Sequence, residues 1–205
     1  MEAVMKRNSG IALVGDIPWG SHFCQFYKTK KDLLDILIPY FRAGLENREL
    51  CVLVTSDFFG TEETLAALKK GVPGFSEYQA KKQFEIFPYT DWYLKGGKFD
   101  LRRTLDMWME KHDEALARGF DGMRVSGNSH WIGHRKDWDD FACYEAEIND
   151  VICGTKLLVL CTYSLKKCGV VEIMDVIKNH EFALAMNQGV WQVVRMPANC
   201  HHNLD

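Results

Sequence analysis

The side chains best suited to chemistry in this 205-residue chain begin in the run His22–Tyr27, which reads HFCQFY. Side chains alternate along an extended strand, so His22, Cys24 and Phe26 are expected on one face. Imidazole and thiolate groups are suitable ligands for a transition metal. The sequence contains no CxxC, HExxH or GxSxG motif. It therefore does not indicate a standard zinc, thioredoxin or hydrolase site.

The segment after this run lacks a phosphate-binding loop. Residues Lys28–Asp32 contain no glycine and lead directly into an apolar helical pattern over Leu33–Gly44. A phosphate loop needs glycines, so that backbone N–H groups can turn toward the phosphate, followed by Lys and Ser or Thr. The lysines around the helix N-terminus could still attract an anion. The sequence thus indicates the scaffold of a nucleotide-binding protein without the residues that bind and hydrolyse the nucleotide. This favours a ligand-binding function over hydrolysis.

Polar and aromatic residues follow the ends of the predicted strands. If the sheet is parallel, these ends share one edge, where open α/β sheets bind ligands. The residues concerned include Tyr27, Trp92, Tyr93, Asn128, Trp131 and Tyr163. Their clustering predicts an apolar pocket with a polar rim. Turn formation and covering of the core are the alternative explanation for many of them.

A buried carboxylate is predicted on the helical segment 137–152. Positions spaced by three and four residues form one stripe there. The stripe consists of Trp138, Phe141, Glu145, Ile148 and Ile152. Glu145 would then face the sheet, where a buried carboxylate needs a partner. We hypothesise an ion pair with Arg124, which lies in mid-strand; alternatively, Glu145 sits at the edge of the stripe and reaches water.

A Cys/His metal site is a less favoured alternative. His22 and Cys24 share a strand face, and Cys161 could lie on a neighbouring strand. The further candidate ligands are His130, His134 and His180. Their spacing is not diagnostic of a metal site.

The composition indicates one folded domain, 1–205, with a core over about 10–195 and a loose tail over 197–205. Of its residues 47% are hydrophobic and 26% charged, and the formal net charge of −3 argues weakly against a nucleic-acid binder. No apolar stretch is long enough to cross a bilayer, and the N-terminus lacks a signal-peptide core, so we expect a cytoplasmic protein. The seven scattered cysteines are expected to be free.

Apolar runs alternate with helical patterns along the chain. The predicted strands are 22–27, 50–55, 84–88, 122–126, 156–163 and 190–195, and the predicted helices are 31–46, 61–70, 100–118, 137–152 and 169–179. Residues 11–14 could form an edge strand or an arm. Continuous apolar strands between helices predict an α/β fold, a three-layer, doubly wound, mostly parallel sheet.

Several motifs, in this order, resemble the MEDS family, the sensory domain of methanogens, methylotrophs and the dichloromethane-responsive regulator DcmR. The matching segments are His22–Tyr27, Tyr40–Leu45, Leu50–Thr55, Trp92-Tyr93 with Gly96–Phe99, Arg124–Asn128 with Trp131, Tyr144-Glu145, Leu160–Tyr163 and His180. The HxCxFY pattern is the specific part, and the resemblance covers roughly residues 10–195. It implies a RecA/KaiC-like, P-loop-derived sandwich with an eroded phosphate loop.

The resemblance also implies where a ligand would bind. Its candidate residues are His22, Cys24 and Tyr27, with Arg124, Trp131, Glu145 and Tyr163 around them. The strand-end residues Trp92 and Asn128, together with Cys161, complete the predicted site.

By this resemblance, the chain is expected to be a non-enzymatic domain that senses small hydrocarbon derivatives, such as methylated or halogenated one-carbon compounds. Two alternatives stay open: a degenerate RecA-like nucleotide binder with weak ATPase activity, and a Cys/His metal, haem or redox sensor. Affinity is limited to about −1.5 kcal/mol per heavy atom, so a very small ligand would bind in roughly the millimolar range. A larger ligand, or a corrinoid or haem cofactor, is therefore considered as well. We expect a signalling partner protein or a homo-oligomer, and no direct contact with nucleic acid or membranes.

Overall fold

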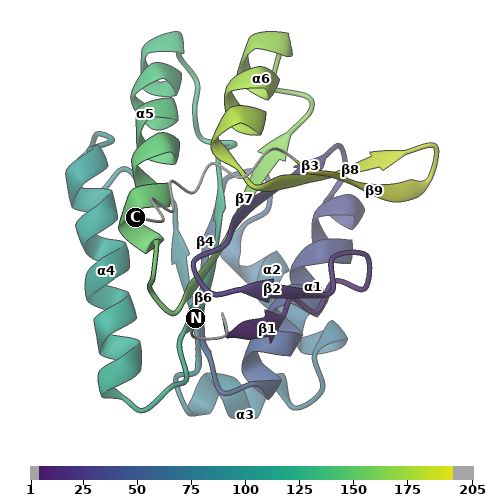
Figure 1. Ribbon diagram of the computed structural model, residues 1–205, viewed down its shortest axis with the longest axis vertical. Helices are drawn as coiled ribbons and strands as arrows, with labels where there is room; N and C mark the ends of the chain where they lie inside the picture. The colour runs from purple at the N-terminus through teal and green to yellow at the C-terminus, as the bar shows by residue number, and fades with distance from the viewer. Residues whose placement is uncertain (1–4, 196–205) are drawn as a thin grey trace, which may run out of the picture.

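A seven-stranded sheet forms the centre of the computed structural model, which describes residues 5–195 (Figure 1). Its strand order is β5-β4-β6-β7-β3-β8-β9; β9 runs antiparallel to β8, and the other neighbours pair in parallel. The strands are β3 (His22–Tyr27), β4 (Leu50–Thr55), β5 (Phe84–Pro88), β6 (Met123–Asn128), β7 (Leu157–Ser164), β8 (Phe182–Asn187) and β9 (Val190–Arg195). A separate hairpin comprises β1 (Lys6–Asn8) and β2 (Asp16–Pro18). This mostly parallel sheet confirms the predicted α/β class.

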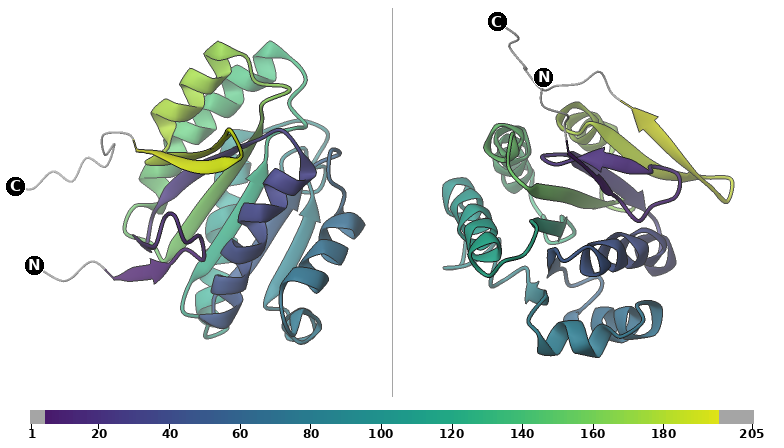
Figure 2. Two further views of the ribbon diagram at one scale, coloured as in Figure 1. Left: turned by 90° about the vertical axis from the view of Figure 1, so that its right-hand side faces the viewer. Right: turned by 60° about the horizontal axis from the view of Figure 1, so that its bottom comes forward.

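Helices cover both faces of the sheet. They are α1 (Lys30–Glu46), α2 (Thr61–Gly71), α3 (Phe75–Ala80), α4 (Leu101–Ala117), α5 (Arg135–Ile152) and α6 (Val170–Asn179). Figure 2 shows α1–α3 on one side of the sheet and α4–α6 on the other. Among residues 5–195, no helix is long and apolar enough to cross a membrane.

The strand order explains this division of the helices. The connections β3–α1–β4 and β4–α2–α3–β5 advance in one direction across the sheet, whereas those that contain α4, α5 and α6 advance in the opposite direction. Crossovers between parallel strands are right-handed, so a reversal of direction moves the helix to the other face. The two helical layers therefore follow from the topology.

Strand β3 lies near the middle of the sheet, and all six of its residues are buried. Cys24 and Phe26 pack in the core under α4–α6, and Phe23 and Tyr27 pack in the core under α1–α3. The predicted alternation of the HFCQFY run is thus confirmed. Because β3 pairs with β7 in parallel, His22 starts the strand opposite Val159, two residues before Cys161.

Most of the predicted elements are confirmed, and four of the predicted strands have the bounds of β3, β4, β5 and β9. Strand β8 and the short helix α3 were not predicted. Strand β8 is linked to β9 by Gln188 and Gly189, which have φ angles of 49° and 79°. Positive φ at both positions is typical of a two-residue hairpin turn.

The N-terminal segment was only partly predicted. Residues 11–14 form turns between β1 and β2 rather than a strand, and Ile11 and Val14 are buried against the α1–α3 layer. The tail predicted over 197–205 lies outside the described residues. Within residues 5–195 the cysteines are free, as predicted.

Candidate functional site

Four buried side chains converge beneath α5 and α6: His22, Glu145, Cys161 and His180. Glu145 Oε2 lies 3.2 Å from Nε2 of His22 and 3.2 Å from Nε2 of His180. Cys161 Sγ lies 3.3 Å from His22 Nε2 and 3.6 Å from Glu145 Oε1. All four donor atoms lie within 4.8 Å of one another. We call these four residues the buried cluster.

Four elements of the fold build this cluster. His22 opens β3 and Cys161 lies in the neighbouring strand β7, both toward the α4–α6 face. Glu145 projects from the middle of α5, and His180 ends α6 immediately before β8. The rings of His22 and His180 lie 4.0 Å apart between centroids. The cluster therefore joins two strands to the two helices that cover them.

Hydrogen bonds behind the cluster fix both imidazole rings. His180 Nδ1 lies 2.6 Å from the carbonyl oxygen of Val176, which can only accept. His22 Nδ1 lies 3.0 Å from Asn149 Oδ1, while Asn149 Nδ2 donates to the carbonyl oxygens of Glu145 and Asn179. Both Nδ1 atoms therefore donate outward. In the neutral rings, both Nε2 atoms then present a lone pair to the Glu145 carboxylate.

Burial and the neighbouring charged groups shift the pKa values of the cluster residues in competing directions. Burial alone would raise the pKa of Glu145, but the imidazoles of His180 and His22, when they are protonated and donate from Nε2, outweigh it and lower that pKa to about 2. Burial, reinforced by His22, lowers the pKa of His180. Burial and the charge of Glu145 raise the pKa of the Cys161 thiol well above its usual value. The carboxylate thus requires a positive charge nearby, and burial opposes placing that charge on His180.

Residues 21–181 match the family model for MEDS, the methanogen/methylotroph, DcmR sensory domain. The chain belongs to the MEDS family. It is therefore a sensory-type domain, and the matched segment contains every member of the buried cluster. A search of curated proteins gave no match.

Two solved structures show the relationship of this MEDS domain to RecA/KaiC-like folds. The KaiC-like protein PH0186 from Pyrococcus horikoshii is 14% identical, with a TM-score of 0.65, over 95% of this chain and 89% of that one. The flagellar accessory protein FlaH from Methanocaldococcus jannaschii is 13% identical, with a TM-score of 0.54, over 88% of this chain and 79% of that one. At this identity the likeness establishes the fold alone.

Several of the predicted site residues meet at the cluster of the MEDS domain. His22, Glu145 and Cys161 are part of it, and the ring of Tyr163 lies 5.7 Å from that of His180. Cys24 shares the strand face and is buried near Glu145, but it is not one of the converging donors. His180 was predicted as a possible metal ligand and as part of the family resemblance, and Asn149 was not predicted. The sequence signal for Asn149 was its position four residues after Glu145, which places both residues on the same face of α5.

The predicted ion pair between Arg124 and Glu145 is wrong. Arg124 lies on the other face of the sheet, where its Nε donates to Glu49 and its guanidinium also donates to the carbonyl oxygen of Tyr40 at 2.6 Å. It donates further to the carbonyl oxygens of Asn8 and Ser9. The hydrogen bonds of Arg124 therefore connect the N-terminal hairpin to α1. The β-alternation placed Arg124 correctly opposite Met123 and Val125, but it could not say which helices cover that face.

The remaining predicted residues lie in two other places. At the carboxyl edge of the sheet, Asn128 bonds to the hydroxyls of Tyr27 (3.1 Å) and Thr162 (3.0 Å). Trp131 stacks on Tyr93 with ring centroids 5.5 Å apart. The structure thus does not gather all the strand-end residues around one pocket. The buried cluster itself lies under the helices rather than at that edge.

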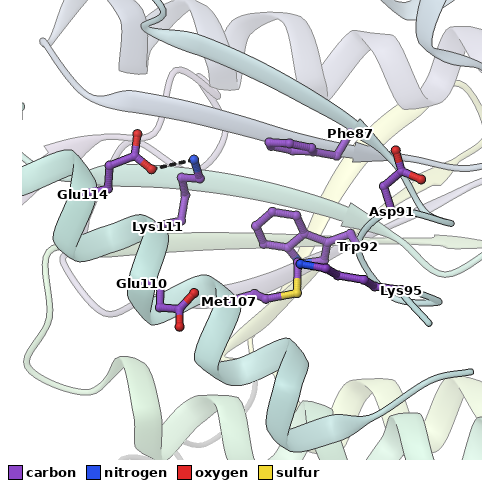
Figure 3. Close-up of a pocket in the computed structure, with 8 residues that line it drawn as sticks. All are labelled: Phe87, Asp91, Trp92, Lys95, Met107, Glu110, Lys111 and Glu114. Atoms are coloured by element: carbon purple, nitrogen blue, oxygen red, sulfur yellow. Dashed lines mark hydrogen bonds and ion pairs between the residues drawn. The ribbon is translucent and has the colours of Figure 1, made fainter.

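Trp92 borders a surface groove between α4 and the end of β5 (Figure 3). Its ring packs against Trp108, with centroids 4.2 Å apart. Lys111 forms ion pairs with Glu114 at 2.6 Å and with Glu85 at 3.0 Å. The groove is lined by Phe87, Asp91, Trp92, Lys95, Met107, Glu110, Lys111 and Glu114. None of these residues belongs to the buried cluster.

The N-terminus of α1 follows β3, in the segment that the sequence predicted to lack a phosphate-binding loop. There the carboxylate of Asp32 accepts hydrogen bonds from the backbone N–H groups of Lys28 at 3.0 Å and Thr29 at 2.9 Å. Thr29 Oγ1 accepts in turn from the N–H of Asp32, which completes a capping box. The chain therefore satisfies with its own carboxylate the N–H groups that would otherwise face an anion.

Proposed function

We propose that this MEDS domain is a non-enzymatic sensor that binds a small organic compound, a one-carbon or other simple hydrocarbon derivative, beside the buried cluster. The observation that carries the proposal is the cluster itself. Burying a carboxylate, two imidazoles and a thiol in an otherwise apolar core is unfavourable for folding. Such a group of residues is typical of a binding or chemical site.

A crevice between α5 and α6 supports binding at this position. Its walls come from α5, α6 and β7, and Glu145 lies among them. The lining residues are Trp138, Phe141, Ala142, Glu145, Tyr163, Asp175, Val176 and Asn179. Aromatic and aliphatic walls with a few polar groups suit a small organic molecule. In this structure the crevice is closed to a water-sized molecule, so a ligand must part the two helices.

That requirement links binding to a signal. Opening the crevice would displace α6, whose last turn leads through His180 directly into β8. A ligand that binds only the open form shifts the population toward it. We expect a partner protein or a second copy of the chain to receive that change.

The test is titration calorimetry of the purified domain with methanol, methylamines, methyl sulfides and chloromethanes. We expect at least one compound to bind the wild type and to bind His22→Gln at least tenfold more weakly. The matched control is His112→Gln, which replaces a buried histidine of α4 outside the cluster and should bind as the wild type does. Equal binding to all three proteins, or no binding by any compound of the panel, contradicts the proposal.

A second candidate function, nucleotide binding, is favoured only by the RecA/KaiC-like fold. The Asp32 cap opposes it, because that carboxylate occupies the N–H groups at the helix terminus. Thermal-shift measurements with millimolar ATP and Mg²⁺ separate the two functions. A stabilisation that requires Mg²⁺–ATP would favour nucleotide binding; the sensor proposal expects none.

A further inference from the structure

We propose that His22, Glu145, Cys161 and His180 bind one divalent transition-metal ion and that Zn²⁺ is the ion their donor set suits best. Metal binding at these residues is independent of whether an organic compound also binds nearby. It rests on the spacing of the four donor atoms, on the protons available to them and on the bonds that hold the rings in place.

The donor atoms have the mutual spacing of ligands around one ion. With metal–ligand bonds of about 2.0–2.3 Å, ligand atoms at the corners of a tetrahedron are separated by roughly 3.3–3.7 Å. The observed separations are 3.2 Å for each Nε2 from Glu145 Oε2 and 3.3 Å for His22 Nε2 from Cys161 Sγ. Sγ lies 3.6 Å from the other carboxylate oxygen, Oε1, and the four donor atoms all lie within 4.8 Å of one another. Small adjustments would bring all four atoms into the first coordination sphere.

The centre of the cluster is short of protons. Because both Nδ1 atoms donate outward, the neutral rings turn two lone pairs toward a carboxylate. Among residues 5–195, Glu145 Oε2 and His180 Nε2 have no hydrogen-bond partner of good geometry, although both are buried. The thiol of Cys161 is the remaining source of a proton. A cation at the centre satisfies every one of these acceptors, and the thiol proton passes to solvent as the thiolate binds.

The surrounding bonds match those that orient metal ligands in proteins. A metal-bound imidazole usually donates its other N–H to a carbonyl or carboxylate, which fixes the tautomer and the ring. Val176 accepts from His180 in this way, and Asn149 accepts from His22. Asn149 is itself held by the carbonyl oxygen of Asn179 at 2.9 Å.

The chemistry of the donors favours a borderline-soft ion. Two imidazoles, one thiolate and one carboxylate suit Zn²⁺, whereas Mg²⁺ and Ca²⁺ prefer oxygen ligands alone. Four protein ligands would make a closed site. Glu145 also lines the crevice between α5 and α6, so the ion has a route when those helices part.

The experiment starts with chelator-treated protein, to which Zn²⁺ or Co²⁺ is added before dialysis. We expect elemental analysis to give one ion per chain. The Co²⁺ form should show thiolate-to-cobalt charge-transfer absorption in the near ultraviolet and the intense visible bands of four-coordinate cobalt. Less than about 0.2 ion per chain, or a cobalt spectrum without the thiolate band, overturns the proposal.

Substitutions of single residues test which side chains bind the ion. Cys161→Ser should remove the charge-transfer band, while the matched control Cys24→Ser, on the same strand face, should keep it. His180→Gln should weaken Zn²⁺ binding more than Asn149→Leu, for which the loss is expected to be about 10- to 100-fold. His112→Gln should leave binding unchanged. Loss of the band in Cys24→Ser but not in Cys161→Ser, or unchanged affinity in His180→Gln, overturns the assignment. If His180→Gln fails to fold, the cobalt spectra of the two cysteine variants decide.

Discussion

The imidazole of His180 lies 3.2 Å from the carboxylate of Glu145, and this contact joins the end of α6 to the middle of α5. Both side chains are buried, and Glu145 also lines the crevice between the two helices. The proposed binding group Glu145 therefore contacts the residue at which α6 leads toward β8. Changes at Glu145 should therefore affect both folding and binding.

We expect Glu145→Ala to lower the free energy of unfolding by about 3–5 kcal/mol, because it removes the anion that a buried, protonated imidazole of His22 or His180 needs and leaves a cavity in the core. Glu145→Gln should lose less, since the amide can still meet one ring. Urea unfolding followed by circular dichroism measures both changes. The control is Glu147→Gln on the same helix, which removes a partly exposed pair with Arg102 at 3.3 Å and should change stability by less than about 1 kcal/mol. Equal losses for Glu145→Ala and Glu147→Gln would show that the cluster does not stabilise the fold.

Arg124 and Glu49 form a second buried pair, on the opposite face of the sheet. Arg124→Leu should destabilise the domain by about 3–5 kcal/mol, because it leaves the Glu49 carboxylate and several carbonyl oxygens without their donor. The double variant Arg124→Leu, Glu49→Leu should be more stable than the sum of the single losses predicts. A double-mutant cycle from urea unfolding gives this coupling energy, expected at about 0.5–3 kcal/mol. A coupling energy of zero would contradict the pairing.

The sequence predicted strand positions well and side-chain partners poorly. A buried strand such as β4 is a short apolar run between polar residues, so its bounds can be predicted from the sequence. Strand β8 contains alanines and a methionine directly after a helix, and only its partners in the sheet make it a strand. The partner of Arg124 depended on which face α5 covers. That follows from the strand order, because connections that advance in opposite directions place their helices on opposite faces.

The same limit applies to the candidate site. The alternation of β3 correctly set His22 and Cys24 on one face, and the helical stripe correctly buried Glu145. Neither pattern contains the register between β3 and β7, which brings Cys161 beside His22. His180 follows the end of α6, where helical periodicity stops and the direction of the side chain depends on the turn into β8.

Gly44 lies inside α1, where alanine would normally stabilise a helix by about 1 kcal/mol. Here a Cβ atom would lie 2.5 Å from the Cδ and Nε atoms of Arg124. We therefore expect Gly44→Ala to lower the melting temperature, because the new methyl group displaces Arg124 from Glu49. Gly133→Ala is the control, since no atom lies within 4 Å of its added Cβ and its φ is not positive. A melting temperature of Gly44→Ala at or above that of the wild type would mean that Arg124 can move at no cost.

The cap formed by Asp32 should make stability depend on acid. Burial alone would raise the pKa of this carboxyl, but hydrogen bonds from the N–H groups of Lys28 and Thr29 and from the Thr29 side chain outweigh it and lower the pKa. A carboxyl whose pKa is lower in the folded state stabilises the fold above its unfolded pKa of about 3.9 and loses that effect as the pH falls through the folded value. Asp32→Asn should therefore lower the free energy of unfolding by less than about 1 kcal/mol at pH 7, because solvent screens this partly exposed group, and by still less below about pH 4.

Urea unfolding of both proteins at pH 7 and near pH 3 measures the difference. Asp35→Asn is the control, because it removes only the pair with Lys31 on the solvent side of the same helix and should cost little at either pH. If the loss in Asp32→Asn is the same at both pH values, the carboxylate charge does not contribute to the cap. Mg²⁺–ATP that stabilises Asp32→Asn but not the wild type would show that this cap blocks an otherwise competent phosphate site.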